Sequence, residues 1–182
     1  MTKLADFSVG QEFINEFDEI NRELLQLYAK ASGDTNPIHT RDEIAEKAGL
    51  NGVIAHGLFS FGFITKMFED MLNQENDGQL IECGVEMRGM VRCGDTLVTK
   101  ATVSKVDGKD VHFDIEQRTI TPVDIKDKEG NIVKQFEAGE RGYISEKDEA
   151  KGLVHTKEVD EGILTFRDRL ACPGHAIIRL KM

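Results

Sequence analysis

The chain has 182 residues, a length typical of one domain with one substantial core rather than of two domains. Its formal charge of -10, from 23 basic and 33 acidic side chains, argues against a nucleic acid or an anionic membrane surface as its partner. The sequence shows no signal peptide and no run of about 18 apolar residues, so we expect a cytoplasmic protein. The three cysteines, Cys83, Cys93 and Cys172, lack metal-like or redox-like spacing, and we expect free thiols and no bound metal.

Helical periodicity dominates the first third of the chain. Apolar residues at helical spacing predict an amphipathic helix over residues 18–33, with Gly33 as its left-handed cap. A capping-box pattern predicts a second, short helix over residues 40–49. A third helix is predicted over about residues 57–73, and because its apolar residues occupy nearly the whole circumference, we expect it to be buried.

Strands are predicted downstream, where β-branched and apolar residues are interrupted by glycine-containing turns. They cover about residues 82–92, 96–106, 110–121 and 131–144. One long buried helix followed by consecutive antiparallel strands predicts an α+β architecture, with a curved sheet wrapped around the helix. In the tail only residues 176–180 resemble a strand, so we expect a domain of residues 1–146 and a C-terminal extension, residues 147–182, to which the pattern assigns no role.

The segment between the first two predicted helices carries the candidate chemistry. Pro37 has no amide hydrogen and disfavours a helical conformation at Asn36, so this segment must be an ordered loop. Asp34 and His39 are five residues apart and would not share a face of a continuous helix, but on a loop they can converge on one water molecule. A carboxylate and an imidazole supply the base and the acid that hydration of an α,β-unsaturated thioester needs.

The start of the predicted buried helix offers a third group that hydration needs, a hydrogen-bond donor. Amides in the first turn of a helix have no intrahelical acceptor, and the helix dipole is positive there. Gly57 has no side chain to obstruct a carbonyl oxygen that approaches these amides. We therefore expect the Gly57 amide to stabilise the enolate oxygen that forms during hydration.

Two motifs together resemble a known family. The string SGDTNPIH at residues 32–39, with Tyr28 before it and IAHG at residues 54–57 after it, resembles the signature of MaoC-like (R)-specific enoyl-CoA hydratases. Residues 87–97 resemble the strand–turn–strand of the same family, with Met90 where a proline is common. The resemblance spans about residues 8–145 and implies a hot-dog fold, a homodimer or higher homo-oligomer, and a tunnel for pantetheine at the dimer interface.

The resemblance also implies roles for individual residues. The catalytic aspartate and histidine of the family fall on Asp34 and His39, and its oxyanion donor falls on Gly57. Asn36 matches the asparagine of the motif, and Thr65 is the nearest match to a hydroxyl residue on the central helix. The implied activity is that of a lyase in fatty acid metabolism, a hydratase or dehydratase that interconverts 2-enoyl and 3-hydroxyacyl thioesters. The substrate carries coenzyme A, or the phosphopantetheine of an acyl-carrier protein, and no other cofactor is expected.

Other interpretations of the same residues remain open. Asp34 also fits ordinary turn chemistry, and His39 a structural histidine. His56 fits a tunnel wall or a structural hydrogen bond, so we place it outside the catalytic set. Arg88 and Arg92 would share one face of a strand, where they either contact the phosphates of coenzyme A or are simply solvated.

Two alternative functions fit the same fold. A hot-dog acyl-thioesterase would direct an activated water at the carbonyl carbon instead of the β-carbon. A non-catalytic hot-dog subunit would complete the tunnel of a partner and has no need of Asp34 or His39. The presence of both residues favours the hydratase.

Overall fold

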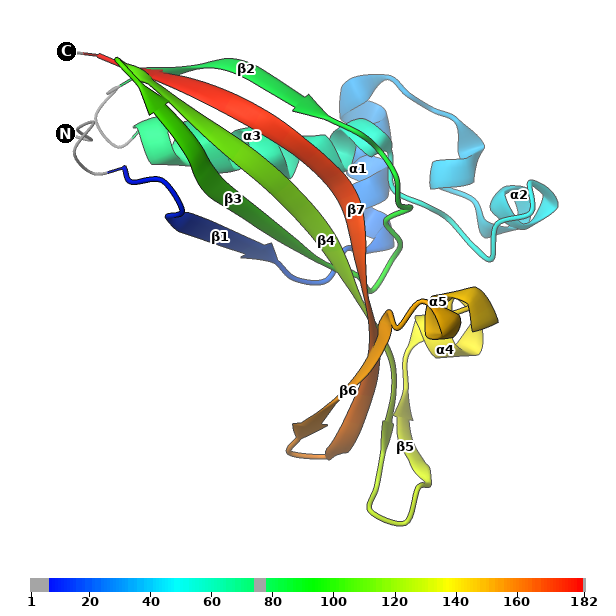
Figure 1. Cartoon of the computed structure of the whole chain (residues 1–182). Helices are drawn as coiled ribbons and strands as arrows, with labels where there is room; N and C mark the ends of the chain where they lie inside the picture. The colour runs from blue at the N-terminus through cyan, green and yellow to red at the C-terminus, as the bar shows by residue number, and fades with distance from the viewer. Residues whose placement is uncertain (1–6, 74–77, 182) are drawn as a thin grey trace.

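The computed structural model describes residues 7–73 and 78–181, in which a long helix lies along one curved antiparallel sheet (Figure 1). The strands are β1 (Glu12–Phe17), β2 (Gly78–Val85), β3 (Thr96–Asp107), β4 (Asp110–Lys126), β5 (Ile132–Gln135), β6 (Val154–Val159) and β7 (Gly162–Leu180). The helices are α1 (Arg22–Ser32), the 3-10 turn η2 (Pro37–His39), α2 (Asp42–Lys47), α3 (Gly57–Asn73), α4 (Glu137–Glu140) and α5 (Glu146–Ala150).

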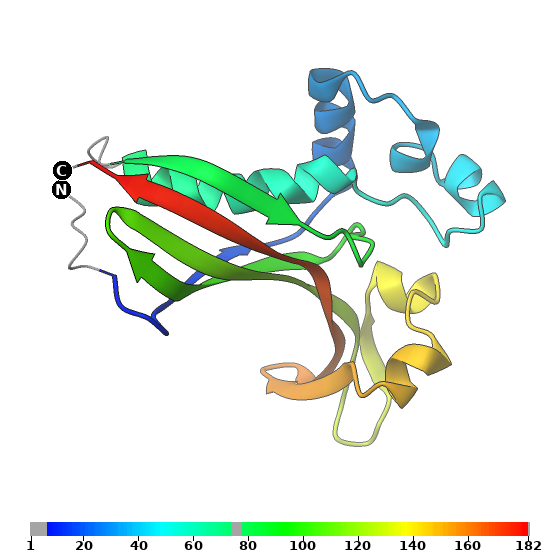
Figure 2. The ribbon, with the colours of Figure 1, turned by 45° about the horizontal axis from the view of Figure 1, so that its top comes forward.

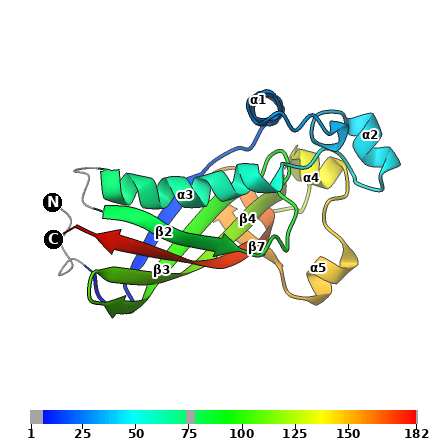
Figure 3. The same ribbon diagram turned by 90° about the horizontal axis from the view of Figure 1, so that it is seen from above.

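The sheet follows the order β1-β3-β4-β7-β2, while β5 pairs with β4 and β6 pairs with β7. All of these pairs are antiparallel. Along β3 buried and less buried residues alternate, as expected for a strand with one face on the core. Viewed from above, α3 runs lengthwise over the sheet (Figure 3). The predicted α+β hot-dog arrangement is therefore confirmed.

The apolar core lies between α3 and the sheet. Ile64 and Phe68 on α3 are fully buried, and the Phe68 ring meets the ring of Phe113 on β4 edge-on at 5.1 Å between centroids. Each fully buried side chain of this size stabilises the fold by about 1.5–3 kcal/mol. The helix is not buried all round in the single chain, however, since Leu58 in its first turn is 63% exposed.

Two of the predicted strands are displaced. The first predicted strand, expected over residues 82–92, is β2, and it ends at Val85. Beyond it the amides of both Arg88 and Gly89 donate to the one carbonyl of Ala171, which breaks the regular pattern of hydrogen bonds between strands. The last predicted strand, expected over residues 131–144, is only four residues long as β5. Beyond it the chain turns into α4, where Ala138 is buried.

The C-terminal tail is part of the sheet and not an appendage to it. Strand β7 is 19 residues long and lies between β4 and β2, paired with β4 from Arg179 to Ile163. A boundary at residue 147 would separate β7, an inner strand of the sheet, from its neighbours β4 and β2, so residues 147–182 are not an extension outside the expected domain of residues 1–146. Charged residues such as Arg167 obscured the strand, because a buried arginine does not fit the apolar pattern of a strand interior.

Beyond a bulge at Gln117 and Arg118, β4 and β7 continue away from α3 and form a separate lobe (Figures 1 and 2). We call residues 118–170 the arm; it contains β5, β6, α4 and α5. A bulge inserts an extra residue on one strand and bends it, which accounts for the change of direction. Among the described residues, no helix is long and apolar enough to cross a membrane.

Candidate active site

The loop after α1 is ordered by its own side chains. Helix α1 ends at Gly33, whose positive φ of 77° provides the predicted left-handed cap. The Ser32 hydroxyl accepts a hydrogen bond from the Asp34 amide at 3.2 Å, and Oδ1 of Asp34 accepts one from the Asn36 amide at 3.2 Å. The Asn36 side chain in turn accepts the amide of Ile38 at 3.3 Å and caps η2. Consecutive side-chain to backbone hydrogen bonds of this kind give the loop one conformation.

The position and the tautomer of His39 are set by one contact. Its Nδ1 lies 2.8 Å from the carbonyl oxygen of Ile54. A carbonyl only accepts hydrogen bonds, so Nδ1 carries the proton of the neutral ring and Nε2 keeps a lone pair. The half-buried His39 therefore presents a basic nitrogen rather than a donor.

His56 supports both members of the pair. Its ring stacks on the His39 ring at 3.8 Å between centroids, with 28° between the planes. Its Nε2 lies 3.0 Å from the carbonyl oxygen of Asp34 and donates to it. Our sequence interpretation left His56 outside the catalytic set, yet one buried ring holds the Asp34 backbone and the His39 imidazole. Its position directly before the buried helix was the signal that indicated an ordered role.

A carboxylate oxygen of Asp34 and one ring nitrogen each of His39 and His56 lie within 4.8 Å of one another. One water molecule can bridge groups at this separation, because each of its hydrogen bonds spans about 2.8 Å. The residue types would also suit a metal ion. Stacked rings, however, direct their lone pairs along nearly parallel planes instead of toward one ion at about 2 Å. The geometry fits a bound water better than a metal.

A pocket of about 260 Å³ opens beside His39, whereas Asp34 and His56 are not among its lining residues. Its wall also includes Gly57, Ser60 and the irregular segment 87–91. Other hollows on the described surface lie beside Arg22 (about 290 Å³), between hairpin tips of the arm (about 450 Å³) and beside Arg141 (about 430 Å³). Of these four hollows, the 260 Å³ pocket alone brings His39 and the start of α3 together.

The start of α3 has the predicted free amides. The carbonyl of His56 accepts the amides of Phe59 and Ser60, so Gly57 and Leu58 occupy the first turn, whose amides lack an intrahelical acceptor. A Cβ at Gly57 would overlap the sulfur of Met87, whose side chain lies directly on this position. Met87 is 52% exposed, so its flexible end can move when a ligand approaches.

The structure does not bring Thr65 to the pocket. Its hydroxyl donates back to the carbonyl of Gly62 at 3.1 Å, about two turns farther along α3 than the pocket. The hydroxyl that lines the pocket belongs to Ser60, which is 2% exposed. The spacing of three residues from Gly57 places Ser60 on the same face of the helix and would have identified it.

The two candidate phosphate contacts are in different environments. Arg88 lies exposed at the pocket and pairs with Glu86 at 2.6 Å. Arg92 is 6% exposed, and its guanidinium lies over the ring of Tyr143 at 4.4 Å. The chain leaves the sheet before both residues, so the shared strand face that we expected does not exist. Arg92 is too deeply buried to contact a phosphate at the surface.

Comparisons with known proteins agree with this fold and motif. A family model described as MaoC like domain matches residues 7–125, and the chain belongs to this family. A similar curated protein is the fatty acid synthase beta subunit TOXC of Cochliobolus carbonum, 34% identical over 94 residues. Another is an (R)-specific enoyl-CoA hydratase of Rhodospirillum rubrum, 32% identical over 81 residues. These matches cover 51% and 44% of the chain but only 4% and 55% of the respective relatives.

Solved structures show the same architecture. An (R)-hydratase from A. caviae involved in PHA biosynthesis has a TM-score of 0.62 at 14% identity, covering 96% of this chain and 98% of that one. The R-hydratase PhaJ1 from Pseudomonas aeruginosa has a TM-score of 0.60 at 17% identity, covering 97% and 84%. The ChsH1-ChsH2 complex from Mycobacterium tuberculosis has a TM-score of 0.61 at 11% identity, covering 96% and 98%. At such identities the likeness establishes the fold alone.

Proposed function

We propose that this chain is a hydratase or dehydratase that interconverts a 2-enoyl thioester and a 3-hydroxyacyl thioester through a water held between Asp34 and His39. The observation that carries this proposal is the Asp34–His39 pair on an ordered loop, with a carboxylate oxygen and a ring nitrogen within 4.8 Å of each other and a pocket beside His39. Family membership supports it, because one similar protein is an (R)-specific enoyl-CoA hydratase.

In the hydration direction the pair activates the water. Nε2 of His39, free because Nδ1 donates to Ile54, and the Asp34 carboxylate accept hydrogen bonds from the water, and one of the two takes a proton from it. The water oxygen bonds to the β-carbon while the π electrons move toward the thioester oxygen. The same proton then returns to the α-carbon, so one molecule of water is added in total.

The enolate oxygen needs a donor while the charge develops. We assign this role to the Gly57 amide at the start of α3, where Met87 must first move aside. Gly57→Val places a branched side chain where the oxygen would bind, and kcat should fall by about 100-fold or more. Gly62→Ala, at an open position on the same helix, is the matched control and should leave turnover unchanged. Equal turnover in both variants would place the oxyanion site elsewhere.

The proposal needs no cofactor beyond the pantetheine that the substrate carries, as coenzyme A or on an acyl-carrier protein. Arg88 is the phosphate contact that the pocket leaves available. Exposed apolar side chains, among them Leu58 and Met87, would be covered by a second copy of the chain. Light scattering should report at least a dimer. Two similar solved structures, the ChsH1-ChsH2 and HadBC complexes, contain two different chains, so a stable monomer would favour a distinct partner subunit.

The test of the function follows the absorbance of the conjugated thioester with crotonyl-, octenoyl- and branched enoyl-CoA. Asp34→Asn and His39→Ala should each lower kcat by about 10² to 10⁴. The double variant should lose little more than the worse single one, because both groups act on one water in one transition state. Asp114→Asn, an exposed carboxylate on β4, is the control. Folded single variants with near-normal hydration would refute the proposal, and release of free coenzyme A without hydration would indicate the thioesterase.

A further inference from the structure

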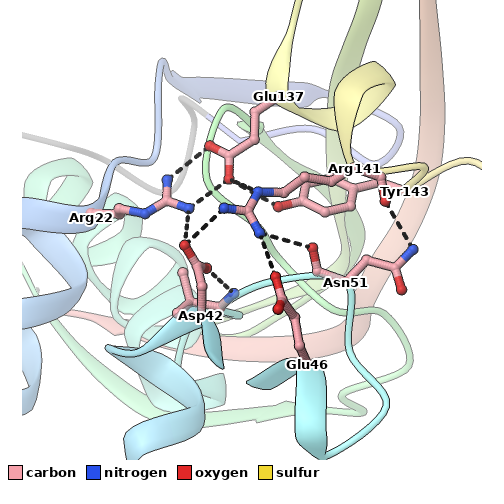
Figure 4. A network of polar contacts seen from close by, with 8 residues as sticks. Arg22, Asp42, Glu46, Asn51, Glu137, Arg141 and Tyr143 are labelled. Carbon is pink, nitrogen blue, oxygen red and sulfur yellow. Dashed lines mark hydrogen bonds and ion pairs between the residues drawn. The ribbon is translucent and has the colours of Figure 1, made fainter. Parts of the chain in front are cut away.

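A network of opposite charges joins the two helices that flank the catalytic loop (Figure 4). Arg22 is the first residue of α1, and Asp42 is the first residue of α2. Their side chains form an ion pair of 2.8 Å, so the helix before the loop is tied to the helix after it. Residues 33–39 are thereby enclosed between two fixed ends.

The same two side chains are held from the arm. Glu137 on α4 accepts hydrogen bonds from both terminal nitrogens of Arg22, at 2.8 and 2.6 Å. Arg141, next to the end of α4, donates to Asp42 at 2.9 Å and pairs with Glu137 at 2.9 Å. The Tyr143 hydroxyl adds a third donor to Glu137 at 3.1 Å. Two charged residues of the arm, Glu137 and Arg141, therefore contact Arg22 and Asp42, the residues that begin the helices on either side of the catalytic loop.

Asp42 also connects the network to the imidazole. Its second oxygen, Oδ1, accepts the amide of Val53 at 3.0 Å. The next residue, Ile54, supplies the carbonyl that fixes Nδ1 of His39, and its amide donates to Ile38 at 3.3 Å. Only one peptide unit separates the Asp42 contact from the His39 contact. A shift of Asp42 would move the Ile54 carbonyl and with it the His39 ring.

The network keeps its charges near neutral pH. Burial pushes up the pKa of Asp42, but the hydrogen bonds from Arg22 and Val53 outweigh it and hold that pKa below its usual value. The Arg22 hydrogen bond likewise holds the pKa of Glu137 below its usual value against the effect of burial. Both carboxylates thus stay ionised over the range in which a hydratase would operate.

We propose that Asp42, held by Arg22 and Arg141, two arginines that Glu137 of the arm binds in turn, is a positioning residue that sets the His39 imidazole against the water. This inference rests on the proposed function for its kinetic consequences. The side chains of Asp42, Glu137 and Arg141 are 26–28% exposed, a setting in which ion pairs add little to global stability. Their value lies in holding the loop, so turnover should suffer more than folding.

The experiment separates these two effects. Glu137→Gln keeps the shape of the side chain but removes its charge, and Asp42→Asn keeps an oxygen for the Val53 amide. Each should lower kcat by about 10- to 100-fold, with KM changed by no more than about twofold, because a misplaced catalytic group slows the chemical step. Arg141→Met should behave likewise, whereas Arg141→Lys should recover part of the loss.

The matched control is Asp110→Asn, which breaks the bidentate pair with Arg179, 2.7 Å on each side, where β4 begins. It removes an ion pair of similar geometry away from the loop and should leave kcat unchanged. In a His39→Ala background, Glu137→Gln should lower the residual turnover by less than about twofold, because the group that it positions is gone. An undiminished further loss there would show that Glu137 acts independently of His39, and the inference would be wrong.

A second readout does not depend on turnover. Nitrogen NMR of the histidine rings reports which nitrogen carries the proton, and the wild-type signal of His39 should be that of the Nδ1–H form. Glu137→Gln should give a mixture of tautomers, while Asp110→Asn should retain the wild-type signal. Unchanged tautomers and unchanged kcat in folded Glu137→Gln would overturn the inference. If the wild type hydrates no thioester, the proposed function fails, and the NMR comparison still decides whether the arm positions His39.

Discussion

Strands β4 and β7 run through both the arm and the rest of the described chain, which we call the hot-dog half. They bury different kinds of side chain in the two regions. In the hot-dog half they contribute apolar side chains such as Phe113 and Ile178 to the common core. That core takes none of its described members from residues 116–170. In the arm the same strands bury Ile125, but also the polar residues Thr119, Thr121 and Arg167.

Several buried polar groups of the arm have specific partners, whereas Oδ1 of Asp124 and Nε of Arg167 and Arg169 have no hydrogen-bond partner among the described residues. Arg167 is 2% exposed and donates to the Tyr143 carbonyl at 3.0 Å and to the Thr121 hydroxyl at 3.2 Å. The Thr121 hydroxyl in turn donates a hydrogen bond to Oδ1 of Asp95, 2.6 Å away. A buried charge without such partners would be strongly destabilising. The comparison shows that the hot-dog half depends on apolar area, which many sequences supply, whereas the arm depends on particular pairs.

The largest test of this difference is deletion. Removal of residues 147–182 takes away β7, the strand between β4 and β2, and no folded protein should remain, at a cost of the whole stability of about 5–15 kcal/mol. By contrast, replacement of residues 127–162 by an Asn-Gly turn between the paired residues Lys126 and Ile163 should leave the hot-dog half folded. Circular dichroism and thermal melting distinguish the outcomes. An unfolded internal deletion would show that the core needs the arm.

Single substitutions sharpen the comparison next. Phe113→Ala opens a cavity in the core, and Arg167→Ala leaves the partners of a buried guanidinium without their donor. Each substitution should lower the free energy of unfolding by about 3–5 kcal/mol. Arg167→Met should recover part of the loss, because its unbranched apolar chain fills the space while Thr121 keeps its hydrogen bond to Asp95. Urea unfolding measures all three variants. An Arg167→Met variant no more stable than Arg167→Ala would mean that the arm requires its buried charge.

Titration of Asp95 should make the free energy of unfolding depend on pH, with a smaller effect of definite sign. Burial raises the pKa of this carboxyl to about 6 against the hydrogen bond from Thr121, which lowers it. Below about pH 4 the group is protonated in both folded and unfolded chains, and its contribution to stability is full. Between about pH 4 and 6 the unfolded chain releases the proton first, so the free energy of unfolding should fall by about 3 kcal/mol as the pH rises.

The Asp95→Asn variant removes this titration. The stability of the wild type minus that of the variant, measured by urea unfolding, should therefore decrease from about pH 4 to about pH 7. Carboxylates with lowered pKa values, such as Glu137, act in the opposite direction but cancel in the difference. A difference independent of pH would show that the pKa of Asp95 is the same in the folded and the unfolded chain.

The smallest effect is expected at the edge of the charge network. Glu46 is 56% exposed and pairs with Arg141 at 3.1 Å, and Asp70 on α3 is 58% exposed and pairs with Lys66. Glu46→Gln and Asp70→Asn should each change stability by less than about 1 kcal/mol, because exposed ion pairs are weak. Thermal melting at low salt checks this. A loss of several kcal/mol in Glu46→Gln alone would make the network a stability element of the arm.

Sequence reasoning succeeded where local patterns decide structure. The helices before and after the loop, the long α3 and the strand β3 follow from periodicity and capping. The ordered loop around Asp34 and His39 follows from proline and Asx chemistry within eight residues. The family and the fold could therefore be predicted from the sequence alone.

The failures share a different physical cause. Strand β7 was missed except for residues 176–180, because the partners that allow Arg167 to be buried lie 24 and 46 residues away. The link from Arg22 to Glu137 spans 115 residues, and no local pattern indicates such a pair. Thr65 was taken as the nearest match to the hydroxyl residue of the family, whereas the pocket is lined by Ser60. Long-range polar pairs and the placement of a pocket come from tertiary structure alone.

The position of β7 in the sheet has a consequence for how the molecule comes into being. Strand β2 and helix α3 are made well before residues 162–180, yet among the described strands β2 pairs only with β7. Until β7 emerges one flank of the nascent core stays uncovered, and its closure requires contacts of long sequence separation, which form slowly. Before that point cotranslational folding can complete the β1–β3–β4 side but not the β2 side. The chain should therefore depend on chaperone protection until β7 has left the ribosome.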